Sequence, residues 1–138
     1  MKVENKVHPG PENVQTFLAG RDEPVVMVNL LKFREKAEYA DGRDTDLTGQ
    51  QAYGLYAAEM RKLVEADGGS FLFGGVVESL LLGEVEELWD VVGLVEYRSP
   101  KSLVRIASSP DFAEIEKHRE AGLAGQLNLA VRAGGLAD

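Results

Sequence analysis

The chain has 138 residues, of which 44% are hydrophobic and 28% charged, and its formal net charge is −8. This length suits a single domain with a core of its own, and the acidic excess argues against a phosphate-rich partner such as nucleic acid. The chain contains no cysteine and only two histidines, His8 and His118, which excludes disulfides, thiolate metal sites, a cysteine nucleophile and a multi-histidine metal site within one chain.

The sequence begins with a polar stretch, residues 1–13, that lacks the apolar core of a signal peptide. No apolar run reaches the roughly 18 residues of a membrane span, so we expect a cytoplasmic protein with no membrane contact. Residues 10–20 predict a short leading helix, because Pro11 suits a first turn and the apolar residues after it share one stripe. Residues 25–33, VVMVNLLKF, predict a strand that is covered on both faces, because its apolar residues do not alternate with polar ones.

A long polar connection, residues 34–48, follows that strand. Connections of this length inside a compact domain are usually functional lids or mobile loops. A solvated loop with no special role is the alternative, and the sequence does not decide between the two.

One helix and two strands come next. An apolar stripe that ends at two glycines predicts a helix over residues 49–69. Residues 70–83 and 88–99 predict two strands, which an acidic stretch at 83–87 joins as a hairpin.

The last third of the chain repeats one helix-start signal. The Ser-Pro pairs at 99–100 and 109–110 each combine a capping serine with a first-turn proline, and residues 123–134 predict a final strand. The resulting βαββαβ order predicts a ferredoxin-like α+β fold, an antiparallel sheet with its helices on one face. We expect a single domain over residues 1–138.

Both faces of this predicted sheet carry apolar residues. In the last strand the apolar set is Leu127, Leu129 and Val131, and we expect wholly apolar sets to face the helices. The mixed sets on the other face also need cover, which a two-fold homodimer with its sheets face to face provides. The alternative is that the leading helix and residues 34–48 cover that face within one chain.

Two basic residues lie at the rim of the apolar face of the helix that follows Pro110. His118 titrates near neutral pH and is the candidate catalytic acid or base. The planar guanidinium of Arg119 can donate two parallel hydrogen bonds to a substrate carboxylate. The alternative is that both residues pair with acidic neighbours such as Glu114 and Glu116.

Three further residues are candidates for substrate binding. Asn29 is the only uncharged polar residue of its strand, so it either orients a ligand carbonyl or satisfies backbone groups at a strand irregularity. Tyr56 and Trp89 either line a cavity for an aromatic or polyketide-like molecule or belong to the core. No metal or cofactor is expected, and a haem bound by His118 is rejected because nothing else in the sequence indicates a haem site.

Four segments together resemble the family called domain of unknown function 1330. They are PVVMVNLLKFR at 24–34, YGLYAAEMRKLVEADGG at 53–69, WDVVGLVEYRSPKSL at 89–103 and SPDFAEIEKHREAGL at 109–123. The resemblance runs over residues 10–132 and implies the dimeric α+β barrel superfamily, in which two ferredoxin-like units pair their sheets. That superfamily includes cofactor-independent monooxygenases, small isomerases, haem enzymes and non-catalytic ligand-binding domains, and the family itself has no settled activity to transfer.

The sequence therefore predicts a homodimer that binds a small organic molecule in a cavity between sheet and helices. The leading hypothesis is a cofactor-independent enzyme of oxygenase or isomerase type. In it, His118 or a carboxylate abstracts a proton, and Asn29 and Arg119 fix a carbonyl or carboxylate. A ligand-binding module without catalysis and a purely structural dimerisation domain are the alternatives, and an enzyme needs a cavity with convergent polar groups.

Overall fold

The computed structural model describes residues 1–136, which fold into four helices and one four-stranded sheet. In chain order the elements are α1 (Pro11–Leu18), β1 (Val25–Phe33), α2 (Gly49–Ala66), β2 (Ser70–Val76), β3 (Val91–Tyr97), α3 (Pro100–Ala107), α4 (Pro110–Gly122) and β4 (Leu123–Val131). After the leading helix α1, and with α3 and α4 as one helical segment, this is the expected βαββαβ order. None of the helices in the described part has the length and apolar character that a membrane crossing requires.

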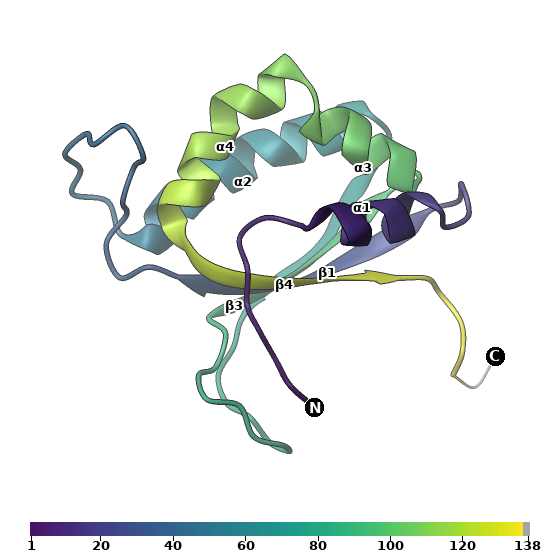
Figure 1. Cartoon of the computed structure of the whole chain (residues 1–138), viewed down its shortest axis with the longest axis horizontal. Coiled ribbons are helices and arrows are strands. Elements are labelled where there is room, and N and C mark those ends of the chain that lie inside the picture. The colour runs from purple at the N-terminus through teal and green to yellow at the C-terminus, as the bar shows by residue number, and fades with distance from the viewer. Residues whose placement is uncertain (137–138) are drawn as a thin grey trace.

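The sheet has the strand order β2-β3-β1-β4, and every neighbouring pair is antiparallel. This order is that of the ferredoxin-like fold. Helices α2, α3 and α4 lie together on one face of the sheet, and among residues 1–136 no helix covers the opposite face (Figure 1). We call that opposite side the helix-free face.

The helix boundaries follow the capping signals of the sequence. Thr48 and Gln51 form a capping box at the start of α2. Ser99 and Ser109 accept hydrogen bonds from backbone N–H groups in the first turns of α3 and α4. Gly68 follows α2 with a φ of +90°, a backbone conformation that glycine adopts without strain.

The main core lies between the sheet and the helices. Val25 and Met27 of β1 and Val95 and Tyr97 of β3 point to the helices, where they pack with α2 residues such as Met60. Alternate residues of the same strands therefore point to the helix-free face, since successive side chains of a strand leave on opposite sides.

The side chains of the last strand, β4, face the opposite sides of the sheet from those we expected. Leu127, Leu129 and Val131 lie opposite Leu30, Val28 and Val26 of β1, so this apolar set points to the helix-free face. The expectation that it faces the helices is wrong. The polar set is tolerated on the helix side because the side chain of Gln126, 8% exposed, finds hydrogen-bond partners there.

The hairpin between β2 and β3 also differs from the expected one. β2 ends at Val76 and β3 begins at Val91, so the first predicted strand, 70–83, is too long. A hydrogen bond from the N–H of Val77 to the carbonyl oxygen of Asp90 closes the ladder at 2.9 Å. The residues beyond it include three consecutive leucines, which in a strand would need apolar cover on both faces of the sheet. They leave the sheet as an arm on the helix-free side (Figure 1).

Neither α1 nor the connection 34–48 covers the helix-free face. Helix α1 contacts α3, and its Phe17 packs against the main core on the helix side. The connection 34–48 packs on α4, where the N–H of Glu38 donates to the carbonyl oxygen of Ala121 at 3.0 Å. The single-chain alternative is therefore wrong. The strand register leaves an apolar surface on this face that consists of Val26, Val28, Leu30, Val92, Leu94, Leu127, Leu129 and Val131.

Candidate functional site

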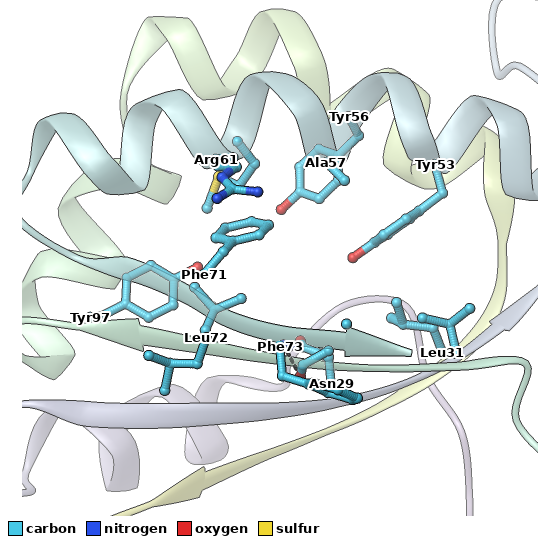
Figure 2. Close-up of a pocket in the computed structure, with 15 residues that line it drawn as sticks. Asn29, Leu31, Tyr53, Tyr56, Ala57, Arg61, Phe71, Leu72, Phe73 and Tyr97 are labelled. Atoms are coloured by element: carbon cyan, nitrogen blue, oxygen red, sulfur yellow. Dashed lines mark hydrogen bonds between the residues drawn. The ribbon is translucent and has the colours of Figure 1, made fainter. Parts of the chain in front are cut away.

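A cavity of about 420 Å³ lies between α2 and the part of the sheet formed by β1, β2 and β3. Its volume falls within the range of small-molecule sites, roughly 300–1,000 Å³. Tyr53, Tyr56 and Arg61 reach it from α2, and Phe71 and Tyr97 reach it from the strands (Figure 2). We call it the α2 cavity.

The floor of the α2 cavity is hollow because small residues follow one another across the sheet. Gly74 of β2 lies opposite Gly93 of β3, and Gly93 lies opposite Asn29 of β1. A Cβ atom placed on Gly74 would meet no heavy atom within 4 Å, and one on Gly93 would come only within 4.0 Å of the Asn29 Cβ. The missing side chains leave the space that a ligand can fill.

Three tyrosines supply the polar groups of the cavity. Tyr56 and Tyr97 are 8% and 7% exposed, and Tyr53 packs between Phe33 and Tyr56 with ring centroids 5.4 and 5.2 Å away. Figure 2 shows the hydroxyls of Tyr53 and Tyr56 directed from α2 toward the sheet. Within residues 1–136, none of the three hydroxyls has a hydrogen-bond partner.

Burial raises the pKa of all three phenols. It raises the pKa of Tyr53 to about 12, and the nearby Arg119 guanidinium opposes the shift. The pKa values of Tyr56 and Tyr97 rise for the same first reason, and the neighbouring phenols add to it. All three groups are therefore neutral near pH 7 and can donate a hydrogen bond to a ligand.

Asn29 lines the cavity, but its amide is already engaged by the protein. Its Nδ2 donates to the carbonyl oxygens of Met27 and Gly93 at 3.3 and 3.2 Å, and its Oδ1 accepts from Nε2 of Gln126 at 2.8 Å. Oε1 of Gln126 in turn accepts from Nη2 of Arg119 at 2.7 Å. The structure thus links two predicted site residues, Asn29 and Arg119, through Gln126, which was not predicted as a site residue.

The rim of the cavity carries one positive charge. The Cζ atom of Arg61 lies 5.7 Å from the ring centroid of Phe71, and its Nε donates to Oε1 of Glu65 at 2.7 Å. Among the residues that line the cavity, none is aspartate, glutamate or histidine. Its chemistry is therefore that of aromatic surfaces and neutral hydrogen-bond donors.

The structure places His118 outside this lining. Its Nδ1 lies 2.7 Å from the hydroxyl oxygen of Tyr39, a buried residue of the 34–48 connection. The Cζ atom of Arg43 lies 4.5 Å from the Tyr39 ring centroid. Partial burial lowers the pKa of His118, and the positive charges of Lys117 and Arg43 lower it further. No residue of the 34–48 connection lines the α2 cavity.

Trp89 also lies outside the lining of the cavity. It comes just before β3, and its Nε1 donates to Oδ1 of Asn5 at 2.7 Å. It therefore ties the N-terminal segment to the sheet. Of the five predicted site residues, Asn29 and Tyr56 line the cavity directly, and Arg119 connects to it through Gln126.

Sequence comparison identifies the family. The profile described as "Domain of unknown function (DUF1330)" matches residues 43–132. The chain belongs to the DUF1330 family. Among the curated proteins, none matches this chain.

Solved structures agree with this membership. The methylated RPA0582 protein is 31% identical to this DUF1330 protein, with a TM-score of 0.87 over 97% of this chain and 98% of that one; RPA0582 is a protein of unknown function from Rhodopseudomonas palustris. A dabb family protein with a ferredoxin-like fold from Mesorhizobium loti is 10% identical, with a TM-score of 0.50 over 81% and 98% of the two chains. SnoaB, a cofactor-independent oxygenase from Streptomyces nogalater, is 13% identical, with a TM-score of 0.51 over 84% and 99%. The last two likenesses show the shared fold alone.

Several residues of the candidate site in this DUF1330 protein are not found from the sequence. Phe71 and Arg61 line the cavity without any motif that marks them, and Gln126 was assigned to the opposite face. The glycines offered the clearest signal, because Gly93 interrupts the helix-facing set of its strand. A single glycine such as Gly93 does not by itself predict a cavity. The space becomes evident only when the strand pairing shows that its neighbour on β2, Gly74, also lacks a side chain.

Proposed function

We propose that this DUF1330 protein binds a small aromatic molecule with exposed oxygen acceptors in the α2 cavity. The observation that carries the proposal is the convergence on the α2 cavity of three tyrosine hydroxyls without protein partners, from Tyr53, Tyr56 and Tyr97. A hydroxyl that lines a cavity without a protein partner is available to a bound molecule. A bound molecule with carbonyl or phenolate oxygens supplies the acceptors they lack.

The rest of the lining fits the same ligand class. The rings of Tyr53, Tyr56 and Phe71 offer flat apolar contact, and aromatic surfaces pack favourably against one another. Arg61 at the rim is paired with Glu65 and keeps its guanidinium against the ring of Phe71, which extends the aromatic wall of the cavity. These features support an aromatic or polyketide-like ligand.

Two probes of nearly equal shape test this proposal. We expect 1,4-naphthoquinone, which carries two carbonyl acceptors, to shift the backbone amide resonances of residues 71–74 and Gly93. Naphthalene, which lacks acceptors, should bind at least about tenfold more weakly, the factor that one hydrogen bond contributes. Equal affinity of the two probes, or shifts confined to other parts of the chain, would contradict the proposal.

A matched pair of glycine variants locates the binding site. Gly74→Leu places a side chain in open space within the cavity and should abolish naphthoquinone binding without unfolding the protein. Gly54→Leu adds the same side chain to an exposed position of α2, also with open space around it, and should leave binding unchanged. Binding that survives Gly74→Leu would contradict the assignment of the α2 cavity.

The second candidate function is a cofactor-independent enzyme of oxygenase or isomerase type. Neutral tyrosine donors in the α2 cavity favour it, because they can stabilise an enolate or phenolate that develops on the substrate. SnoaB, which shares the fold, is named as a cofactor-independent oxygenase. Oxygen consumption or isomerisation of hydroxylated naphthoquinones, lost in a Tyr53→Phe, Tyr56→Phe double variant, tests this function.

The roles of three predicted residues belong to this enzymatic proposal. His118 as the base requires a substrate that reaches the Tyr39 side of α4. Asn29, which lines the cavity, and Arg119, which Gln126 links to Asn29, are the groups that fix a substrate carbonyl or carboxylate. His118→Ala should abolish turnover and leave binding intact if His118 is the base. Unchanged turnover removes it from that role.

We also propose that the protein is a cytoplasmic homodimer that pairs its helix-free faces. The eight apolar residues of that face lie on β1, β3 and β4, and Leu129 and Val131 are 52% and 42% exposed in the single chain. Apolar surfaces of this extent usually mark an interface. Sedimentation of the wild type and of Leu129→Glu tests it: the wild type should be a dimer and the variant a monomer.

A further inference from the structure

The segment between β2 and β3 forms an arm that the proposed function does not use. We call residues 77–90 the leucine arm. It leaves the sheet on the side away from the helices and extends beyond the helix-free face (Figure 1). Its tip carries Leu80, Leu81 and Leu82, which are 42%, 100% and 86% exposed. Three consecutive leucines in contact with water are a strong sign of a missing partner.

The sheet fixes the direction of the arm at its base. The N–H of Asp90 donates to the carbonyl oxygen of Leu31 at 2.7 Å, and Oδ2 of Asp90 accepts from the N–H of Phe33 at 2.8 Å. Nζ of Lys32 donates to the carbonyl oxygen of Leu88 at 3.2 Å. The base of the arm is therefore held to the end of β1.

The charges of the arm identify the class of partner. Residues 77–90 contain Glu78, Glu84, Glu86, Glu87 and Asp90 and no lysine or arginine. An acidic segment is repelled by the negative surface of an anionic membrane. The leucines therefore suit an apolar protein surface rather than a lipid surface.

The place of the arm selects a second copy of this chain as that partner. The arm projects from the same side of the sheet that carries the eight apolar residues of the helix-free face, so any molecule that covers this face also meets the arm (Figure 1). A two-fold axis would supply two arms, one from each copy, that enclose the paired sheets from both sides. A standard interface removes about 800 Å² from each partner, and the leucine tips enlarge the apolar area available for it.

We propose that the leucine arm clasps the second copy of the chain, and that Leu81 and Leu82 become buried against it in the dimer. This inference rests on the proposed homodimer. The arm lies outside the paired sheets. Loss of its leucines should therefore weaken the dimer while the interface between the two sheets remains.

The test compares dimer dissociation constants by sedimentation over a dilution series. The double variant Leu81→Ser, Leu82→Ser should raise the dissociation constant at least about tenfold, since apolar contacts in an interface are worth this much or more. Leu55→Ser, at a 47% exposed position on α2 away from the helix-free face, is the matched control and should leave it unchanged. Both variants should keep the helical circular dichroism of the wild type.

A second readout uses the absence of cysteine in the chain. Leu81→Cys, labelled with an environment-sensitive dye, should shift its emission to shorter wavelength as the protein is concentrated and the dimer forms. The dye on Leu55→Cys should not shift. Phosphatidylcholine–phosphatidylserine vesicles should leave both emissions unchanged at concentrations where the protein is monomeric.

The outcomes separate the clasp from the dimer. A wild-type dimer whose dissociation constant the arm variant leaves unchanged, with no shift of the dye at position 81, would overturn the clasp and leave the dimer intact. A wild type that stays monomeric at all concentrations would overturn both. A shift caused by vesicles instead of by self-association would show that lipid is the partner and would also overturn the clasp.

Discussion

Gln126 donates a hydrogen bond from Nε2 to Oδ1 of Asn29 over 2.8 Å, and the two residues are 97 positions apart in the chain. The guanidinium of Arg119 can only donate, so Oε1 of Gln126 must be its acceptor and Nε2 must face Asn29. The amide of Asn29 is then oriented with Nδ2 toward the backbone carbonyls. One chain of donors and acceptors thus joins α4, β4 and β1.

We expect Gln126→Leu to lower the free energy of unfolding by about 1–3 kcal/mol, because it leaves Oδ1 of Asn29 and one N–H of Arg119 without a partner below α4. Asn128→Leu is the control, since Asn128 is exposed on the same strand and should change stability by no more than about 0.5 kcal/mol. Urea unfolding of the three proteins measures the difference. Equal losses in the two variants would mean that the link carries no special stability.

The crossing of α2 and α4 depends on two glycines in close contact. A Cβ atom on Gly122 would lie 2.9 Å from the backbone nitrogen of Tyr53 and closer still to the carbonyl oxygen of Gly49. Gly122→Ala therefore forces the two helices apart and should cost about 1–3 kcal/mol of unfolding free energy. Gly54→Ala adds the same methyl group where nothing lies within 4 Å, and it should stabilise α2 by about 0.5–1 kcal/mol. Thermal unfolding should move in opposite directions for the two variants.

The sequence was informative where the signal is local. Capping residues such as Ser99 and Ser109 define helix starts by hydrogen bonds within one turn, so the helices could be located before their packing was known. The alternation in β3 also identified which of its residues face the helices. Because these elements come in the order βαββαβ, the fold followed from them.

The sequence was misleading where the outcome depends on partners distant in the chain. The polar set of β4 faces the helices because Asn29 and Arg119 satisfy Gln126, and no local pattern encodes that link. Residues 77–83 of the arm are predicted as strand because their apolar residues continue the run that begins in β2. The sequence predicts a cavity between sheet and helices but not its place, because the space exists where two glycines, Gly74 and Gly93, lie opposite each other, and pairing register is a long-range property.

The tyrosines of the cavity should show their burial in an alkaline titration. Because burial raises the pKa of Tyr53 to about 12 and also raises those of Tyr56 and Tyr97, their phenolate absorbance should appear above the ordinary value of about 10. In concentrated urea the same groups should titrate near 10. Since the folded pKa values are the higher ones, the stability from these groups is complete below about pH 10 and is lost as the pH rises through the folded values.

Variants with a single Tyr→Phe substitution identify which tyrosines give the phenolate absorbance that appears above pH 10. Tyr53→Phe should remove one late-titrating group and leave those of Tyr56 and Tyr97. A native protein whose four tyrosines all titrate near 10, as in urea, would show that the phenols are open to solvent and would weaken the case for a dry cavity.

The contact between His118 and Tyr39 should make stability depend on pH in the mildly acidic range. Partial burial and the charges of Lys117 and Arg43 lower the pKa of His118 in the folded protein, so the unfolded chain binds the proton more readily. The stabilisation is complete above the unfolded pKa of about 6.5 and is lost as the pH falls through the folded value. Protonation leaves both ring nitrogens of His118 as donors, so Nδ1 can then only donate to the Tyr39 hydroxyl oxygen, 2.7 Å away.

Urea unfolding at about pH 7.5 and pH 5.5, on either side of the unfolded pKa, measures this dependence. The wild type should lose free energy of unfolding at the lower pH, and His118→Asn should lose much less, whatever its absolute stability. His8→Asn is the control, because His8 is exposed and lies 3.4 Å from Glu120, so it should keep the wild-type dependence. If His118→Asn retains the full loss at low pH, the dependence originates in other groups and the Tyr39 contact does not sense protonation.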